Sequence, residues 1–159
     1  MADRYPRRAE TSAQEIDSPM SGELVSLRQV PDDLFSSGAM GEGVAILPDR
    51  GEVVAPCDGA VLYSLQFSHA IGVVAEGGAE ILIHIGLDAQ TRAGGLFRFH
   101  VKEDQAVKRG DLLLTMNLDA MERKSLYALV TVTNSGDYSS VHLSGEKKIC
   151  AGDRLMTVS

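Results

Sequence analysis

Residues 67–88 read FSHAIGVVAEGGAEILIHIGLD. Apolar residues on both sides of the pair Gly77-Gly78 favour two β-strands, and two adjacent glycines supply the positive φ angles that a two-residue hairpin turn requires. With these glycines at the centre of the turn, Ile71 lies opposite His84. The stretch is therefore expected to form an antiparallel hairpin.

The predicted register places two histidines on one face of the hairpin. His69 becomes the diagonal neighbour of His84, and diagonal neighbours lie about 7–8 Å apart at Cα, close enough for two imidazoles to share a small group. The same face holds Ile71, Val73 and Leu82, an apolar surround that marks a protein docking site where it is exposed. The opposite face is expected to be core and holds Ala70, Val74, Ile81, Ile83 and Ile85.

A histidine pair of this kind suits the transfer of a phosphoryl group. A neutral imidazole is a nucleophile, and its reference pKa of about 6.5 leaves it mostly neutral at cytoplasmic pH. His84 can therefore accept a phosphoryl group, while His69 donates a hydrogen bond to the phosphoryl oxygens and offsets their charge. Asp88, which follows shortly after His84, is expected to support the site by orienting an N–H or repelling a misplaced group.

Other chemistries fit the sequence less well. A zinc site needs a third ligand, and neither an HxH nor an HExxH spacing follows His84, so no metal is predicted; a two-histidine site completed by a partner's carboxylate stays open as an alternative. The Pro-x-x-Gly-x-Val turns are similar to those of swinging-arm carrier domains, but no Met-Lys-Met hairpin is present for biotin or lipoate. No cofactor is therefore expected. His100 and His142 are isolated and are expected on the surface.

Two short patterns occur twice along the chain. Residues 18–25 (SPMSGELV) are echoed by residues 55–62 (APCDGAVL), and residues 107–113 (VKRGDLL) are echoed by residues 149–155 (ICAGDRL). Each copy places a proline or a Gly-Asp turn directly before an apolar strand. This repetition predicts an internally duplicated β structure.

Further strands are predicted wherever apolar residues alternate or run continuously. The expected strands are Val44–Leu47, Ala60–Leu65, Ile71–Ala75, Glu80–Ile85, Leu112–Met116, Ala128–Thr133 and Leu155–Val158. One short helix is expected over Leu118–Leu126, where Asp119 near the N-terminus favours the helix dipole.

Length and composition indicate one globular domain. A chain of 159 residues can bury a core without disulfides or metals; residues 17–159 are expected to form this domain and residues 1–16 a flexible lead-in or linker. A net charge of −7 without a basic, aromatic face argues against nucleic acid. No apolar run approaches the ~20 residues of a membrane span, and the polar start does not read as a signal peptide. A cytoplasmic protein without membrane insertion is expected.

Residues 17–158 resemble the glucose-type enzyme IIA (EIIA) of the bacterial phosphoenolpyruvate-dependent sugar phosphotransferase system (PTS). Seven matching segments together make the resemblance specific. They are Val30-Pro31-Asp32 with Phe35, Met40-Gly41-Glu42-Gly43-Val44-Ala45-Ile46, Ala55-Pro56 with Asp58-Gly59, His69-Ala70-Ile71-Gly72, residues 80–88 (EILIHIGLD), residues 107–112, and Val132-Thr133-Asn134.

The resemblance implies an all-β antiparallel sandwich or barrel with at most short helical turns. It implies a phosphotransferase component in which His84 is phosphorylated and His69 supports it. HPr would be the phosphoryl donor, and a cysteine of a IIB domain of a sugar permease the acceptor. The surface that docks both partners would comprise Leu34, Phe35, Ala39, Met40, Phe67, Ile71 and Leu82.

The chain departs from the usual family pattern at three places. Phe67 replaces a threonine that usually stands two residues before the first histidine, which removes a polar contact beside His69. The sequence also reads Gly94-Gly95-Leu96-Phe97 for Gly-Glu-Gly-Phe, and Leu129 for a proline. A second hypothesis keeps the same surface but makes the chain a regulatory module that docks permeases or kinases, with phosphorylation as a switch.

Overall fold

The computed structural model describes residues 13–65, 69–86, 95–121 and 126–159. In this part of the chain almost all regular structure is strand, and every paired strand is antiparallel. The elements in chain order are β1 (Gln14–Asp17), β2 (Gly22–Ser26), η2 (Leu27–Gln29), α1 (Asp33–Ser36), β3 (Glu42–Pro48), β4 (Glu52–Val54), β5 (Gly59–Leu65), β6 (Ala70–Ala75), β7 (Glu80–Ile85), β8 (Phe97–Phe99), β9 (Ala106–Val107), β10 (Leu112–Met116), η4 (Leu118–Ala120), β11 (Ala128–Val132), η6 (Ser135–Asp137), β12 (Val141–Leu143), β13 (Lys148–Ile149) and β14 (Arg154–Val158).

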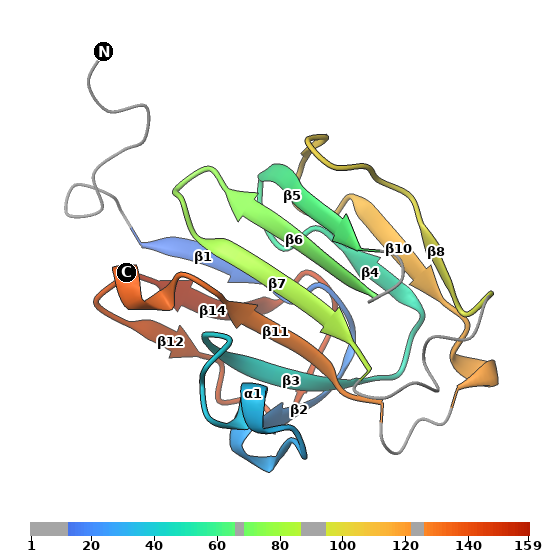
Figure 1. Cartoon of the computed structure of the whole chain (residues 1–159), viewed down its shortest axis with the longest axis horizontal. Coiled ribbons are helices and arrows are strands. Elements are labelled where there is room, and N and C mark those ends of the chain that lie inside the picture. The colour runs from blue at the N-terminus through green and yellow to red at the C-terminus, as the bar shows by residue number, and fades with distance from the viewer. Residues whose placement is uncertain (1–12, 66–68, 87–94, 122–125) are drawn as a thin grey trace.

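Three sheets pack around one main core. The largest has the strand order β13-β2-β3-β11-β7-β6-β5-β9, and two three-stranded sheets, β1-β14-β12 and β4-β10-β8, pack against one of its faces (Figure 1). The core between them draws Ile81, Ile83 and Ile85 from β7, and buried residues such as Leu113 and Leu155 from the small sheets. The expected antiparallel sandwich is confirmed.

A second, smaller cluster covers the outer face of the large sheet. Leu27, Val30 and Phe35, from the segment that contains η2 and α1, pack there on Leu82 and Leu129 of the central strands. In Figure 1 α1 lies in front of β3, on this outer face. Asp32 caps α1 by accepting a hydrogen bond from the Leu34 N–H at 2.9 Å, which fixes the start of this short helix.

The internal duplication is visible in the hydrogen bonds of the repeated turns. The Ala55 N–H donates to the Asp111 carbonyl at 2.7 Å, and at the matching place in the other copy the Ser18 N–H donates to the Asp153 carbonyl at 2.7 Å. The glycine before each aspartate has a positive φ, 90° in one copy and 94° in the other. The two repeated patterns therefore form the same strand-and-turn unit twice.

Two sequence-based expectations differ from the structure. The first described strand begins at Gln14, before the expected start at Asp17, and its Ile16 is 1% exposed and pairs with Met156 of β14. One isolated apolar residue in a polar stretch gives no strand pattern to detect. Residues 1–12, the rest of the expected lead-in, lie outside the described residues.

Of the helix expected over Leu118–Leu126, the described residues form only the single turn η4, and Met121 is already extended, with φ −117° and ψ 150°. Residues 122–125 lie outside the described residues, and Leu126 is buried in the main core just before β11.

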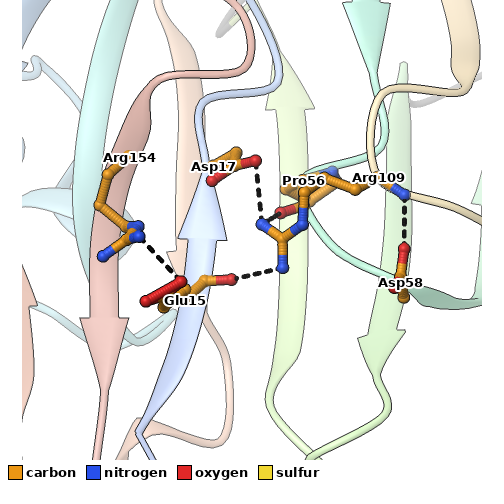
Figure 2. Close-up of polar contacts among 6 residues, drawn as sticks. All are labelled: Glu15, Asp17, Pro56, Asp58, Arg109 and Arg154. Atoms are coloured by element: carbon orange, nitrogen blue, oxygen red, sulfur yellow. Dashed lines mark hydrogen bonds and ion pairs between the residues drawn. The ribbon is translucent and has the colours of Figure 1, made fainter.

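Arg109 ties the repeated turns to the N-terminal strand. Its guanidinium forms an ion pair with the Asp17 carboxylate at 2.9 Å and donates to the carbonyls of Glu15 and Pro56 at 3.1 and 3.3 Å (Figure 2). The backbone N–H of Arg109 donates to the Asp58 carboxylate at 2.8 Å. Arg109 thus connects β1 to the loop of Pro56 and Asp58 and to its own loop.

Candidate functional site

Strands β6 and β7 pair as the predicted hairpin, but their register is shifted by one residue. His84 lies opposite Ala70 and Ile83 opposite Ile71. The Ala75 N–H bonds the Ala79 carbonyl at 2.8 Å, so three residues instead of two form the loop. Of the two glycines in the loop only Gly78 has a positive φ, at 105°, whereas the expected turn needs positive φ at both.

The shift reverses the predicted faces of β6 while leaving those of β7 intact. Ile71 and Val73 point into the main core and are fully buried, so the predicted place of Ile71 on the docking surface is wrong. Ala70 lies instead on the outer face, in the same cluster as Leu82. A one-residue slip has this effect because side chains alternate between faces with a period of two. Val74, which was expected to face the core, lies on the same face of β6 as Ala70 and is only half-buried.

His84 lies near the end of β7, on the outer face of the large sheet. Its ring centroid is 5.5 Å from that of Phe35 of the α1 segment, with the rings tilted by 46°. Leu129, the residue that replaces the family's proline, lies directly opposite His84 on β11 and is fully buried. The imidazole is half-buried and its Nδ1 atom is buried.

His69 precedes β6 and has an unusual backbone. Its φ is +51°, in the left-handed region that residues with a Cβ atom rarely adopt. Its carbonyl accepts a hydrogen bond from the Ile85 N–H at 3.0 Å. The main chain of His69 thus lies beside the end of β7, one residue from His84. The strict alternation of a strand does not extend to His69, so the diagonal geometry expected for an extended residue does not describe it.

The His69 imidazole stacks on Phe97 of β8. The ring centroids are 3.9 Å apart, the planes differ by 24°, and His69 is 6% exposed. Strand β8 belongs to the small sheet β4-β10-β8, so this contact joins two sheets beside the site. Sequence reasoning noted Phe97 only as part of a family pattern. No local signal links it to His69, since the contact depends on how the sheets pack.

The predicted docking residues divide by burial. Leu34 on α1 is 60% exposed, Ala39 is exposed and Met40 is half-buried, whereas Phe35 and Leu82 are buried in the cluster beneath them. The exposed residues can contact a partner directly. The buried pair can only support them.

Two further side chains extend the apolar surface beside His84. Leu65 lies opposite Ala70 at the end of β5 and is 48% exposed, and Tyr63 packs over Gly72 in the same outer cluster. Burial raises the pKa of the Tyr63 phenol, with a smaller contribution from the charge of Glu80. Alternation along β5 would have found both residues once the true register was known.

The remaining predicted residues stand as follows. Asp88 and Phe67 lie outside the described residues. His100 and His142 are exposed, as expected, and the His100 Nε2 is 3.3 Å from the Thr115 hydroxyl. Among the residues that the structure describes, no three His, Cys, Asp or Glu side chains gather as a metal site would require.

A buried hydroxyl lies beneath the outer cluster. Thr131 is on β11 opposite Leu82, is fully buried, and its Oγ1 has no hydrogen-bond partner among the described residues. A buried polar atom without a partner costs stability, so Thr131 is a weak point of the fold directly under the site.

With this fold and histidine site the chain belongs to a family of phosphoryl carriers, the EIIA 1 family of the phosphoenolpyruvate-dependent sugar phosphotransferase system, whose family model matches residues 14–138. Among solved structures it is similar to the glucose permease IIA from Mycoplasma capricolum. The two share a TM-score of 0.80 at 28% identity, over 92% of this chain and 96% of that one.

Curated relatives are longer proteins that contain such a domain. The chain is 45% identical over 127 residues to the PTS system glucosamine-specific EIICBA component of Bacillus subtilis (strain 168), covering 79% of this chain. It is 42% identical over 140 residues to the PTS system beta-glucoside-specific EIIBCA component of Dickeya chrysanthemi, covering 87% of this chain. These matches span 20% and 22% of the two relatives.

Among the residues that the structure describes, no helix has the length and apolar character needed to cross a bilayer.

Proposed function

We propose that His84 accepts a phosphoryl group through Nε2 and passes it to a second protein. The observation that carries this proposal is the half-buried imidazole at the end of β7, whose Nδ1 is buried and whose ring sits at the edge of an apolar surface. A neutral imidazole has one nucleophilic nitrogen, and here burial leaves Nε2 for that role.

The transfer proceeds in two displacement steps. In the first, the Nε2 lone pair forms a bond to phosphorus while the bond to the nucleophile of phospho-HPr breaks, and that nucleophile keeps the electron pair. In the second, a cysteine sulfur of a IIB domain attacks phosphorus and His84 leaves as an imidazole. His69, held beside the end of β7, donates a hydrogen bond to the phosphoryl oxygens as their charge is redistributed.

Both partners dock on the apolar surface around His84. Leu34, Ala39 and Leu65 are its most exposed side chains, and Met40 lies partly buried between α1 and β3. Acidic residues border it, including the exposed Asp33 on α1, and the whole chain carries a net charge of −7. A partner with an apolar centre and a basic rim is the complement of this surface.

The acceptor is a IIB domain on the cytoplasmic side of a sugar permease. Relatives carry EIIBCA or EIICBA in their names, which supports transfer from an A domain to a B domain. Transfer between domains of one system needs both to face the same compartment. The reducing cytoplasm also suits the two free cysteines, Cys57 and Cys150.

Phosphoryl transfer from radiolabelled phosphoenolpyruvate through enzyme I and HPr tests this proposal. We expect an acid-labile, base-stable phosphate on the wild type, none on His84→Gln, and slower labelling of His69→Gln. His100→Gln and His142→Gln are matched controls, because both histidines are exposed and lie outside the site. Labelling of His84→Gln at the wild-type level, or loss of labelling in either control, would overturn the assignment.

A further inference from the structure

We infer that Phe97 is a positioning residue for phosphoryl transfer, acting by holding the His69 imidazole in one orientation. The inference rests on the proposed function, because it gives His69 its task at His84. It adds a residue from a different sheet to the site. Three observations carry it: the strained backbone of His69, the close ring stacking, and the rigid support of Phe97.

The backbone of His69 needs support from its surroundings. Among the described residues other than glycine, only His69 and Asp104 have a positive φ. A residue other than glycine keeps this backbone conformation only where several neighbouring contacts hold it in place, and such residues cluster at functional sites. The hydrogen bond from the Ile85 N–H to the His69 carbonyl holds the main chain, whereas the orientation of the imidazole depends on contacts of the ring itself.

Stacking on Phe97 restrains the orientation of the ring. With centroids 3.9 Å apart and planes 24° from parallel, the phenyl ring covers one face of the imidazole. A ring covered in this way can slide in its plane but cannot turn over without losing the contact. The edge that carries the nitrogens is thereby kept in a fixed plane, as a hydrogen-bond donor to a transferring group requires.

Phe97 itself is well anchored. It pairs with Met116 of β10, and the carbonyl of the preceding Leu96 accepts the Asn117 N–H at 2.8 Å. Its ring is half-buried and packs against the main core. The β4-β10-β8 sheet therefore holds the Phe97 ring in a fixed position against His69, while the large sheet carries His84.

A matched control exists two residues along the same strand. Phe99 is also half-buried, packs against the same core and pairs with β10 opposite Leu114. The stacking contact with His69 is made by Phe97. Phe97→Leu and Phe99→Leu thus remove comparable core contacts, but only Phe97→Leu removes the ring that stacks on the His69 imidazole.

Rapid-quench transfer from phospho-HPr to the full chain is the first test. We expect Phe97→Leu to slow the maximal transfer rate on the order of tenfold with an unchanged half-saturating HPr concentration, since Phe97 positions a group rather than docking the partner. Phe99→Leu should transfer at the wild-type rate, and Phe97→Tyr, which keeps the ring, should restore most of it. Equal rates for the two leucine variants would overturn the inference.

A double-mutant comparison separates positioning from general loss of structure. If Phe97 acts through His69, then Phe97→Leu slows the wild type but not a His69→Gln background. If it slows both backgrounds equally, the role is structural and the inference fails.

NMR tests the stacking independently of activity. The Phe97 ring current shifts the His69 ring C–H resonances, and Phe97→Leu should abolish this shift while Phe99→Leu leaves it. Unmoved resonances in Phe97→Leu would refute the contact itself. A failure of the proposed function is recognised separately, as continued labelling of His84→Gln.

Discussion

Replacing Arg109 by methionine should destabilise the protein substantially, although the guanidinium lies near the surface. Methionine keeps the stem of the side chain and removes the ion pair with Asp17 and the hydrogen bonds to the Glu15 and Pro56 carbonyls. The Asp17 side chain is only 13% exposed, so its carboxylate is left poorly solvated without its partner. The Pro56 carbonyl keeps a second donor, the Asp17 N–H, and contributes less.

The expected magnitude follows from these contacts. The ion pair contributes at most about 1 kcal/mol, since the Arg109 side chain is 40% exposed and solvent screens it. The stranded carboxylate and the lost hydrogen bond to Glu15 add about 1 to 2 kcal/mol. Arg109→Met should therefore lower the free energy of unfolding by about 2 to 3 kcal/mol, and the urea midpoint by about 1 M or more.

Arg154→Met is the matched control for this experiment. Arg154 pairs with Glu15 at 2.8 Å, but both side chains are about half exposed, at 49% and 54%, so the loss should stay below about 0.5 kcal/mol. Urea unfolding followed by circular dichroism suits a chain that has no tryptophan. If the two variants lose the same stability, the contacts of the Arg109 guanidinium contribute no more than an exposed ion pair and the reasoning is refuted.

Three further outcomes are expected. Thr131→Val should raise the free energy of unfolding by about 1 kcal/mol in urea titrations, because it removes a buried hydroxyl without a partner; a loss of stability would contradict this. Burial raises the pKa of the Cys57 thiol to about 12, so a thiol reagent at pH 8 should modify one cysteine per folded chain and none in Cys150→Ser. Because the folded pKa of Cys57 lies above its ordinary 9, its contribution to stability is complete below pH 9 and is lost towards pH 12. Ile71→Ala should cost about 2 to 5 kcal/mol as a core truncation, whereas Leu34→Ser should leave stability within about 0.5 kcal/mol and weaken HPr docking; the reverse pattern would restore the predicted register.

The sequence predicted the strands well where each one carries its own pattern. All seven expected strands are present, because alternation or a continuous apolar run is a property of the local chain. Strands of two or three residues, such as β8, β9 and β13, are too short to show a pattern. Sheet pairing alone defines them.

The sequence points to candidate residues for the site but not to their geometry. The repeated patterns and the neighbouring histidines could be found in the sequence. The pairing of β6 with β7, however, depends on whether both glycines of the turn or only Gly78 adopt a positive φ. Glycine tolerates positive and negative φ at both positions, so the residue identities in the turn do not determine the register. The contacts of Phe97 with His69 and of Arg109 with Asp17 join segments far apart in the chain, and only the packed sheets bring them together.

The central claim, that Nε2 of His84 carries the phosphoryl group, is tested most directly by NMR of the ¹⁵N-labelled, phosphorylated chain. We predict a phosphorus coupling to the Nε2 resonance of His84, while its Nδ1 keeps the chemical shift of an unmodified nitrogen. A coupling to Nδ1 of His84, or to either nitrogen of His69, would contradict the account.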